Sequence, residues 1–303
     1  MTAAAPPAAG RRLAVAAGII AVSFLAVFHV WPLLVILQRS LTSLGGISAV
    51  LTDPWYLRLT GFTFGQALLS TLLTLLVGLP AAIVFARWSF PGKRLLRSTF
   101  TIPFVMPTVV AGMGFLALLG PRGSLGINLQ GTFTVIMLAH VFYNAALVIR
   151  IVGSYLESVA AGPELAAASL GAGPWRRLLR VTLPTARPAI LAAAALVFVL
   201  TFTSFGVILI LAPAWPTLEV EIYRLTARLL QLETAAVLVI IQLLTVTVMT
   251  WLYTRWQAQL AVPVTGSSQP ARRARPAQLK DRRRKTPGGT TVILRPPGRP
   301  APA

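Results

Sequence analysis

Six apolar stretches, separated by polar segments, dominate this chain of 303 residues. They run approximately over 13–38, 64–86, 100–120, 132–154, 186–212 and 235–254. Roughly 20 apolar helical residues cross a hydrocarbon core of about 30 Å, and lipid offers no partner for unpaired backbone groups. The pattern therefore predicts an all-α membrane protein with six transmembrane helices within residues 13–261, after a short N-terminal segment, 1–12.

Prolines interrupt two of these stretches, with Pro80 in the second and Pro103 and Pro107 in the third. Proline removes an intrahelical hydrogen bond and kinks a helix. Such kinks suit a bundle that opens and closes. Proline and glycine are also frequent in membrane helices in general, so both interpretations stay open.

The composition excludes an ordinary soluble domain, because only 11% of the residues are charged against about 25% in soluble proteins. The absence of cysteine excludes disulfides, thiolate metal sites and cysteine nucleophiles. Away from their ends the apolar stretches contain neither Asp nor Glu, and only His29, His140 and Arg150 titrate or carry charge. We find no P-loop, no nucleophilic serine motif and no metal-ligand cluster. The sequence thus predicts no catalytic residue, no metal and no cofactor, and a pathway without its own energy source.

The basic residues are distributed unevenly between the two sides. The chain has 27 Lys and Arg against 7 Asp and Glu. With a cytoplasmic N-terminus, five basic residues fall outside, namely Arg39, Arg58, Arg122, Arg224 and Arg228. The remaining 22 of the 27 fall inside. The positive-inside rule then predicts that both termini are cytoplasmic.

The loop over 162–184 is predicted to form two short helices. Pro163 suits a first helical position, Glu164 complements the positive end of the helix, and Gly171 is a natural stop. Pro174 begins the second helix, and Pro184 is expected to end it before the fifth span. A loop helix resting on the membrane, with its arginines among the headgroups, is the alternative.

This loop resembles the EAA loop of permease subunits of binding-protein-dependent ABC importers, approximately E-A-A-x-x-x-G followed nine residues later by an aliphatic position, a variable one and Leu-Pro. The matching residues are Ala166, Ala167, Gly171, Val181, Leu183 and Pro184. The motif's glutamate position holds Leu165, and the acidic residue, Glu164, lies one place earlier. The resemblance implies a coupling helix that docks on a separate ATP-binding subunit through Glu164, Ala166, Ala167, Gly171, Leu183 and Pro184.

The resemblance extends over roughly 55–260. The segments 138–144, 204–206 and 217–224 look like the first half of thiamine and ferric-iron permeases. It implies a bacterial inner-membrane transport subunit, not an enzyme, that moves thiamine or its phosphates, or ferric iron, by alternating access. The implied partners are an ATP-binding subunit dimer, a second permease half of the same or a homologous chain, a soluble substrate-binding protein and membrane lipid. Any ATP is bound by the partner subunit.

Two further groups of polar residues are candidate sites. His140, Tyr143 and Asn144 share one helix face, and with Ser204 they either line the pathway or form interhelical hydrogen bonds of about 0.6 kcal/mol each. After the fifth span, a helical stripe is formed by Leu218, Ile222, Leu225, Leu229 and Leu232. The charges beside it are candidate contacts for a binding protein, or simply solvated: Glu219, Glu221, Arg224 and Arg228.

The segment 262–303 is rich in Pro, Gly, Arg and Ser and is predicted to be a disordered basic tail or linker. It could contact anionic lipid. Nucleic-acid binding is not predicted, because no aromatic residue interleaves with the arginines. A self-sufficient carrier or channel remains an alternative, disfavoured by the missing membrane carboxylates. A membrane-anchored scaffold is disfavoured by the loop over 162–184.

Overall fold

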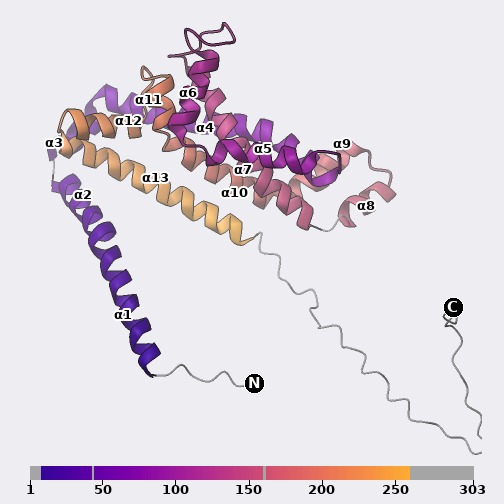
Figure 1. Ribbon diagram of the computed structural model, residues 1–303, viewed down its shortest axis with the longest axis horizontal. Coiled ribbons are helices and arrows are strands. Elements are labelled where there is room, and N and C mark those ends of the chain that lie inside the picture. The colour runs from indigo at the N-terminus through magenta and orange to yellow at the C-terminus, as the bar shows by residue number, and fades with distance from the viewer. Residues whose placement is uncertain (1–7, 43, 160–161, 260–303) are drawn as a thin grey trace, which may run out of the picture. The chain divides into compact units, whose positions relative to one another are not determined.

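The computed structural model describes residues 8–42, 44–159 and 162–259, in which every regular element is a helix (Figure 1). In chain order the elements are α1 (Ala8–Leu25), η1 (Ala26–Val30), α2 (Trp31–Thr42), α3 (Leu44–Thr52), α4 (Pro54–Arg87), α5 (Lys93–Val105), α6 (Thr108–Leu119), α7 (Phe133–Ser158), α8 (Gly162–Ser169), α9 (Pro174–Arg177), η2 (Leu178–Thr182), α10 (Leu183–Phe202), α11 (Gly206–Leu211), α12 (Leu218–Tyr223), η3 (Arg224–Arg228) and α13 (Leu232–Ala258). Each η element is a π-helical turn, with hydrogen bonds to the carbonyl five residues earlier. The basic tail predicted over 262–303 lies outside the described residues.

Five continuous helical segments are long and apolar enough to cross a bilayer, which confirms five of the six predicted spans. They are Val15–Ser40, Pro54–Arg87, Phe133–Ser158, Pro174–Phe202 and Leu232–Ala258. The most apolar part of Val15–Ser40 is not buried at all within the chain. Such an all-round apolar surface is expected of a helix surrounded by lipid.

The third predicted span is not one straight helix. Its two arms, Lys93–Pro103 and Thr108–Leu119, are bent by 102° relative to each other. Between them Met106 and Pro107 have extended backbones, with ψ of 138° and 134°. The ring of Pro107 disfavours a helical conformation at Met106. The pair supplies a sixth crossing only when both arms are taken together.

The fifth predicted span differs at both ends. The helix does not stop at Pro184, because α9 continues through η2 into α10. The N–H of Leu183 donates to the carbonyl of Leu178, five residues back. Pro184 follows directly, and the helix continues through it although its ring supplies no N–H donor. At the other end α10 stops at Phe202, and α11 begins only at Gly206.

The core of the bundle forms around α7, which packs against α4, α5, α10 and α11. It lies close against α4 at Gly78, where an added Cβ would be 2.7 Å from the Cβ of Val148. Small residues every four positions permit this approach, and Thr74 and Ala82, on either side of Gly78, are fully buried. The helix α13 packs against α10.

Candidate functional site

The loop between α7 and α10 contains the turn that the sequence predicts at Gly171. Its backbone has φ of +79°, and nothing lies within 4 Å of a Cβ placed there. The conformation, rather than lack of space, therefore requires glycine. The N–H of Gly171 donates to the carbonyl of Ala168 at 2.9 Å, and that of Ala172 to Ala167 at 3.0 Å, which caps the end of α8.

Glu164 fixes this loop to the bundle. Its carboxylate pairs with Arg87, in the last turn of α4, and accepts a hydrogen bond from the hydroxyl of Thr182 at 2.7 Å. The side chains of Glu164 and Arg87 are each only 22% exposed. Leu165, at the motif's glutamate position, is 63% exposed. The carboxylate one place earlier thus turns inward, and an apolar side chain takes the outer position.

The outer surface of the loop is apolar and uncovered. Leu170 is 87% exposed and Trp175 70% exposed. Beneath Trp175 lies a pocket of about 480 Å³ whose lining includes Arg87, Glu164 and Thr182. Of the other predicted coupling residues, Ala166 is exposed and Ala167 half-buried in α8, while Leu183 and Pro184 lie in the first turn of α10. The exposed apolar side chains therefore lie in the turn after α8 and at the start of α9.

The predicted polar group in the membrane region is brought together inside the bundle. The imidazole of His140 lies between two hydroxyls, with Nδ1 2.8 Å from Ser70 Oγ and Nε2 3.0 Å from Ser204 Oγ. Asn144 donates to the carbonyl of His140 at 2.9 Å. Tyr143 donates to the carbonyl of Pro107 at 3.2 Å, at the break between α5 and α6.

These contacts join α4, α7 and the breaks before α6 and after α10. His140 is only 2% exposed and Asn144 only 5%. The hydrogen bonds of His140 and Tyr143 reach other segments of the bundle, whereas that of Asn144 stays within α7. The role of these residues in lining a pathway stays a prediction. The hydroxyl of Ser70 is the member that the sequence analysis missed, because no local pattern links it to a histidine 70 residues away.

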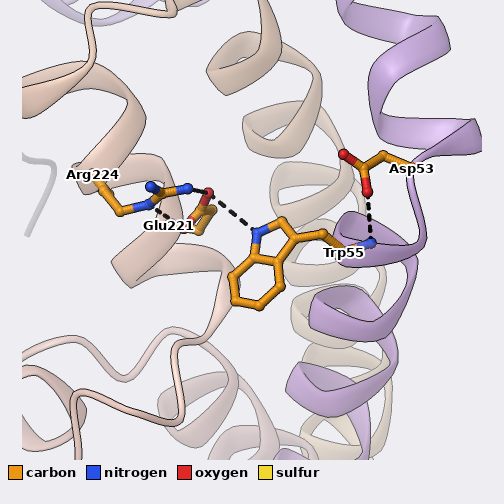
Figure 2. Close-up of polar contacts among 4 residues, drawn as sticks. All are labelled: Asp53, Trp55, Glu221 and Arg224. Atoms are coloured by element: carbon orange, nitrogen blue, oxygen red, sulfur yellow. Dashed lines mark hydrogen bonds and ion pairs between the residues drawn. The ribbon is translucent and has the colours of Figure 1, made fainter.

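A second polar cluster lies at the N-terminal end of α4, away from Arg87. Glu221 in α12 is 1% exposed and accepts two hydrogen bonds from Arg224, at 2.8 Å from Nε and 2.5 Å from Nη2. Figure 2 shows the indole of Trp55 donating to the same carboxylate at 3.5 Å. The backbone N–H of Trp55 is in turn held by Asp53, the N-cap of α4, at 2.8 Å. The hydrogen bond to Glu221 raises the pKa of the Arg224 guanidinium.

This cluster forms one side of a pocket of about 590 Å³ that Arg228 also lines. The Arg228 guanidinium carbon lies 6.0 Å from the ring centre of Tyr223. Glu219 is not part of this pocket, because its carboxylate accepts a hydrogen bond from Gln242 in α13. Asp53 and Trp55 were missed by the sequence analysis, although Asp-Pro before an apolar run is a helix-start signal.

The predicted leucine stripe is correct only in its first half. Leu218 and Leu225 are fully buried, whereas Leu229 is 45% and Leu232 41% exposed. The π turn Arg224–Arg228 inserts extra backbone between the two halves. Leu230 then adopts a positive φ of 55°, and Leu232 starts α13. An α-helical period therefore cannot run through to Leu232.

In the part of the chain that the structure describes, no three histidine, aspartate or glutamate side chains converge as a metal site would require. The family described as binding-protein-dependent transport system inner membrane component matches residues 74–261, from the second span to the end of α13. The chain belongs to this family. It is a transport permease, not an enzyme, and its apolar helices make it a multi-pass inner-membrane protein.

Relatives of the permease include ThiP of Haemophilus influenzae, a thiamine transport system permease protein, which is 32% identical over 242 residues. That alignment covers 75% of the permease but only 44% of ThiP, so the chain spans less than half of that relative. PhnV of Salmonella typhimurium, assigned to 2-aminoethylphosphonate transport, is 32% identical over 226 residues, covering 70% of the permease and 83% of PhnV. A Marchantia polymorpha protein assigned to sulfate transport is 32% identical over 177 residues, covering 56% of the permease and 62% of that protein.

Solved structures share the fold of the permease at low sequence identity. A bacterial ABC transporter that imports the polysaccharide alginate gives a TM-score of 0.66 at 14% identity, covering 81% of the permease and 95% of that chain. The methionine ABC transporter MetNI, in an inward-facing conformation, gives 0.54 at 15% identity, covering 69% and 99%. At these identities the comparison establishes the architecture alone.

Proposed function

We propose that the permease is one membrane-spanning half of an ATP-driven importer, and that the loop over 162–184 receives the movement of a separate ATP-binding subunit. One observation carries this proposal. The loop presents uncovered apolar side chains at Leu165, Leu170 and Trp175, while Glu164 holds its base against α4. Exposed apolar patches mark interaction sites.

In this mechanism the loop end of the bundle is cytoplasmic, as the distribution of basic residues indicates. Closure of an ATP-binding subunit dimer would displace α8, and the Glu164–Arg87 ion pair would pass the displacement into α4. The pathway would form against a second permease half, and the bundle would alternate between its two openings. ATP would be bound by the partner, so the chain itself would need no cofactor.

At the other end, Arg224 and Arg228 are proposed to meet a soluble substrate-binding protein. Both line the pocket of about 590 Å³, and the side chain of Arg224 is 45% exposed. Glu221 would serve instead to hold Arg224, because it is itself buried. Structures of the same fold include an alginate transporter in complex with its periplasmic binding protein, which supports this kind of partner.

The proposed cargo is a small solute, with thiamine or its phosphates as the first candidate. ThiP supports thiamine, whereas ferric iron rests only on the resemblance of the segments 138–144, 204–206 and 217–224. Relatives assigned to 2-aminoethylphosphonate and sulfate widen the set to be tested. A panel of these solutes, assayed for uptake in the assembled transporter, would select among them.

The function is tested by reconstituting the permease with its ATP-binding subunit and binding protein in vesicles. We expect uptake that depends on ATP. Gly171→Leu should leave ATP hydrolysis running while uptake falls at least about tenfold, because leucine disfavours a positive φ. Gly173→Leu is the matched control: Gly173 has φ of −62° and open space around its Cβ. Uptake by the permease alone without nucleotide would instead indicate a self-sufficient carrier or channel.

A further inference from the structure

A pocket of about 430 Å³ lies between α5 and α7, near the end of the bundle that bears the loop over 162–184. Three arginines line it: Arg94 and Arg97 from α5, and Arg150 from α7. Ser154, which also lines it, comes one turn after Arg150. Two helices distant in sequence therefore direct guanidinium groups to one cavity.

The positive charge of this pocket is only partly neutralised. Glu157 pairs with Arg97 at 2.7 Å and with Lys93 at 3.6 Å. Among the described residues, no carboxylate forms an ion pair with Arg94 or Arg150. A neighbouring cavity of about 400 Å³ is lined by Lys93, Arg94 and Arg97 as well. Of the four cations around the two cavities, only two therefore pair with a carboxylate within the described part of the chain.

Like charges held together at the edge of a membrane repel one another, and an anion relieves that repulsion. The planar guanidinium fork matches the oxygens of phosphate and sulfate groups and binds them through two parallel hydrogen bonds. The hydroxyl of Ser154 adds a neutral donor on the same wall. The pocket therefore offers charge and geometry suited to a tetrahedral oxyanion.

We propose that the cavity between α5 and α7 binds a phosphate or sulfate group. Two sources have this chemistry: the headgroup of an anionic lipid, and a free phosphorylated or sulfated solute. This site is separate from the surface of the loop over 162–184. The proposal depends only on the charges of α5 and α7, so it stands or falls independently of ATP-driven transport.

The test follows the thermal unfolding of the purified full chain by tryptophan fluorescence. Free anion is supplied as sodium sulfate and compared with sodium chloride at equal ionic strength. Lipid is supplied as nanodiscs of phosphatidylglycerol and compared with phosphatidylcholine. We expect at least one anion to raise the melting temperature. Protection by phosphatidylglycerol alone identifies a headgroup site, and protection by sulfate identifies a solute site.

The double variant R94Q/R150Q should weaken binding of the protective anion by about tenfold or more, because two charge-assisted contacts are lost. Its matched control is R58Q/R122Q, which removes two exposed arginines elsewhere and should keep the response. If the glutamine variant does not fold, R94K/R150K keeps the charge but loses the fork, and should still bind more weakly. No protection by either anion, an undiminished response in the folded pocket variants, or an equal loss in the control would overturn the proposal.

Discussion

Replacing Gly78 by alanine should force α4 away from α7. The new Cβ would lie 2.7 Å from the Cβ of Val148 and 2.8 Å from its Cγ1. Carbon atoms attract each other at about 3.5–4.0 Å and repel well inside that distance. Val148 is fully buried, and its branched Cβ strongly favours one helical rotamer. The side chain cannot turn aside, so the backbones must separate.

The magnitude follows from two opposing contributions. Overpacking a core costs about 1–3 kcal/mol, while alanine in place of glycine within a helix returns about 0.5–1 kcal/mol. We expect Gly78→Ala to lower the free energy of unfolding by up to about 2.5 kcal/mol. Gly65→Ala in the same helix meets nothing within 4 Å and should raise it by about 0.5–1 kcal/mol. The difference between the two variants isolates the cost of overpacking.

Equilibrium unfolding in mixed micelles, followed by tryptophan fluorescence, would measure both variants. Adding Val148→Gly to Gly78→Ala removes the Cβ of residue 148 together with both γ-methyl groups, and with them the contacts at 2.7 Å and 2.8 Å. Gly78→Ala should therefore cost less in the Val148→Gly background than on its own. Equal stability of Gly78→Ala and Gly65→Ala would refute the packing argument, as would an equal cost of Gly78→Ala in both backgrounds.

Three further outcomes are expected. Glu164→Gln removes the charge partner of Arg87, so the amides of α8 should exchange hydrogen at least about tenfold faster; unchanged exchange would show that the ion pair does not hold the loop. The hydrogen bond to Glu221 raises the pKa of the Arg224 guanidinium above its already high ordinary value. The stabilisation is therefore fully present at neutral and mildly alkaline pH, and is lost only as the pH rises through that raised pKa. Glu221→Gln should therefore lower the melting temperature equally at about pH 7 and about pH 10. A difference in melting temperature between the variant and the natural chain that disappears by about pH 10 would contradict this. His140→Ala should cost about 1–3 kcal/mol and retain transport, whereas lost transport at unchanged stability would assign His140 to the pathway.

Features governed by neighbouring residues could be predicted from the sequence. Gly171 ends α8 and Pro174 begins α9, because a left-handed stop and a proline start depend on local backbone conformation. Five spans followed from length and apolarity, since the bilayer sets both. Pro107 was recognised as a breaker, but the 102° bend was not predictable, because a proline fixes its own φ and not the packing of the two arms.

Features that depend on additional backbone residues or on distant partners could not be predicted from the sequence. The π turns at Leu178–Thr182 and Arg224–Arg228 accommodate an additional residue, which a 3.6-residue period does not register. The partner of Glu164 is 77 residues earlier, and the indole that reaches Glu221 is 166 residues away. Such pairs become visible only when the helices that bear them are placed side by side.

The helix α4 has 34 residues and makes a polar contact near each of its two ends. Its Arg87 end is tied to the loop by Glu164, and its Trp55 end contacts Glu221. At 1.5 Å per residue it measures about 51 Å, more than the hydrocarbon thickness. If the loop over 162–184 receives the movement of an ATP-binding subunit, as proposed, one continuous helix would connect that movement to the pocket beside Glu221, with no intermediate element between them.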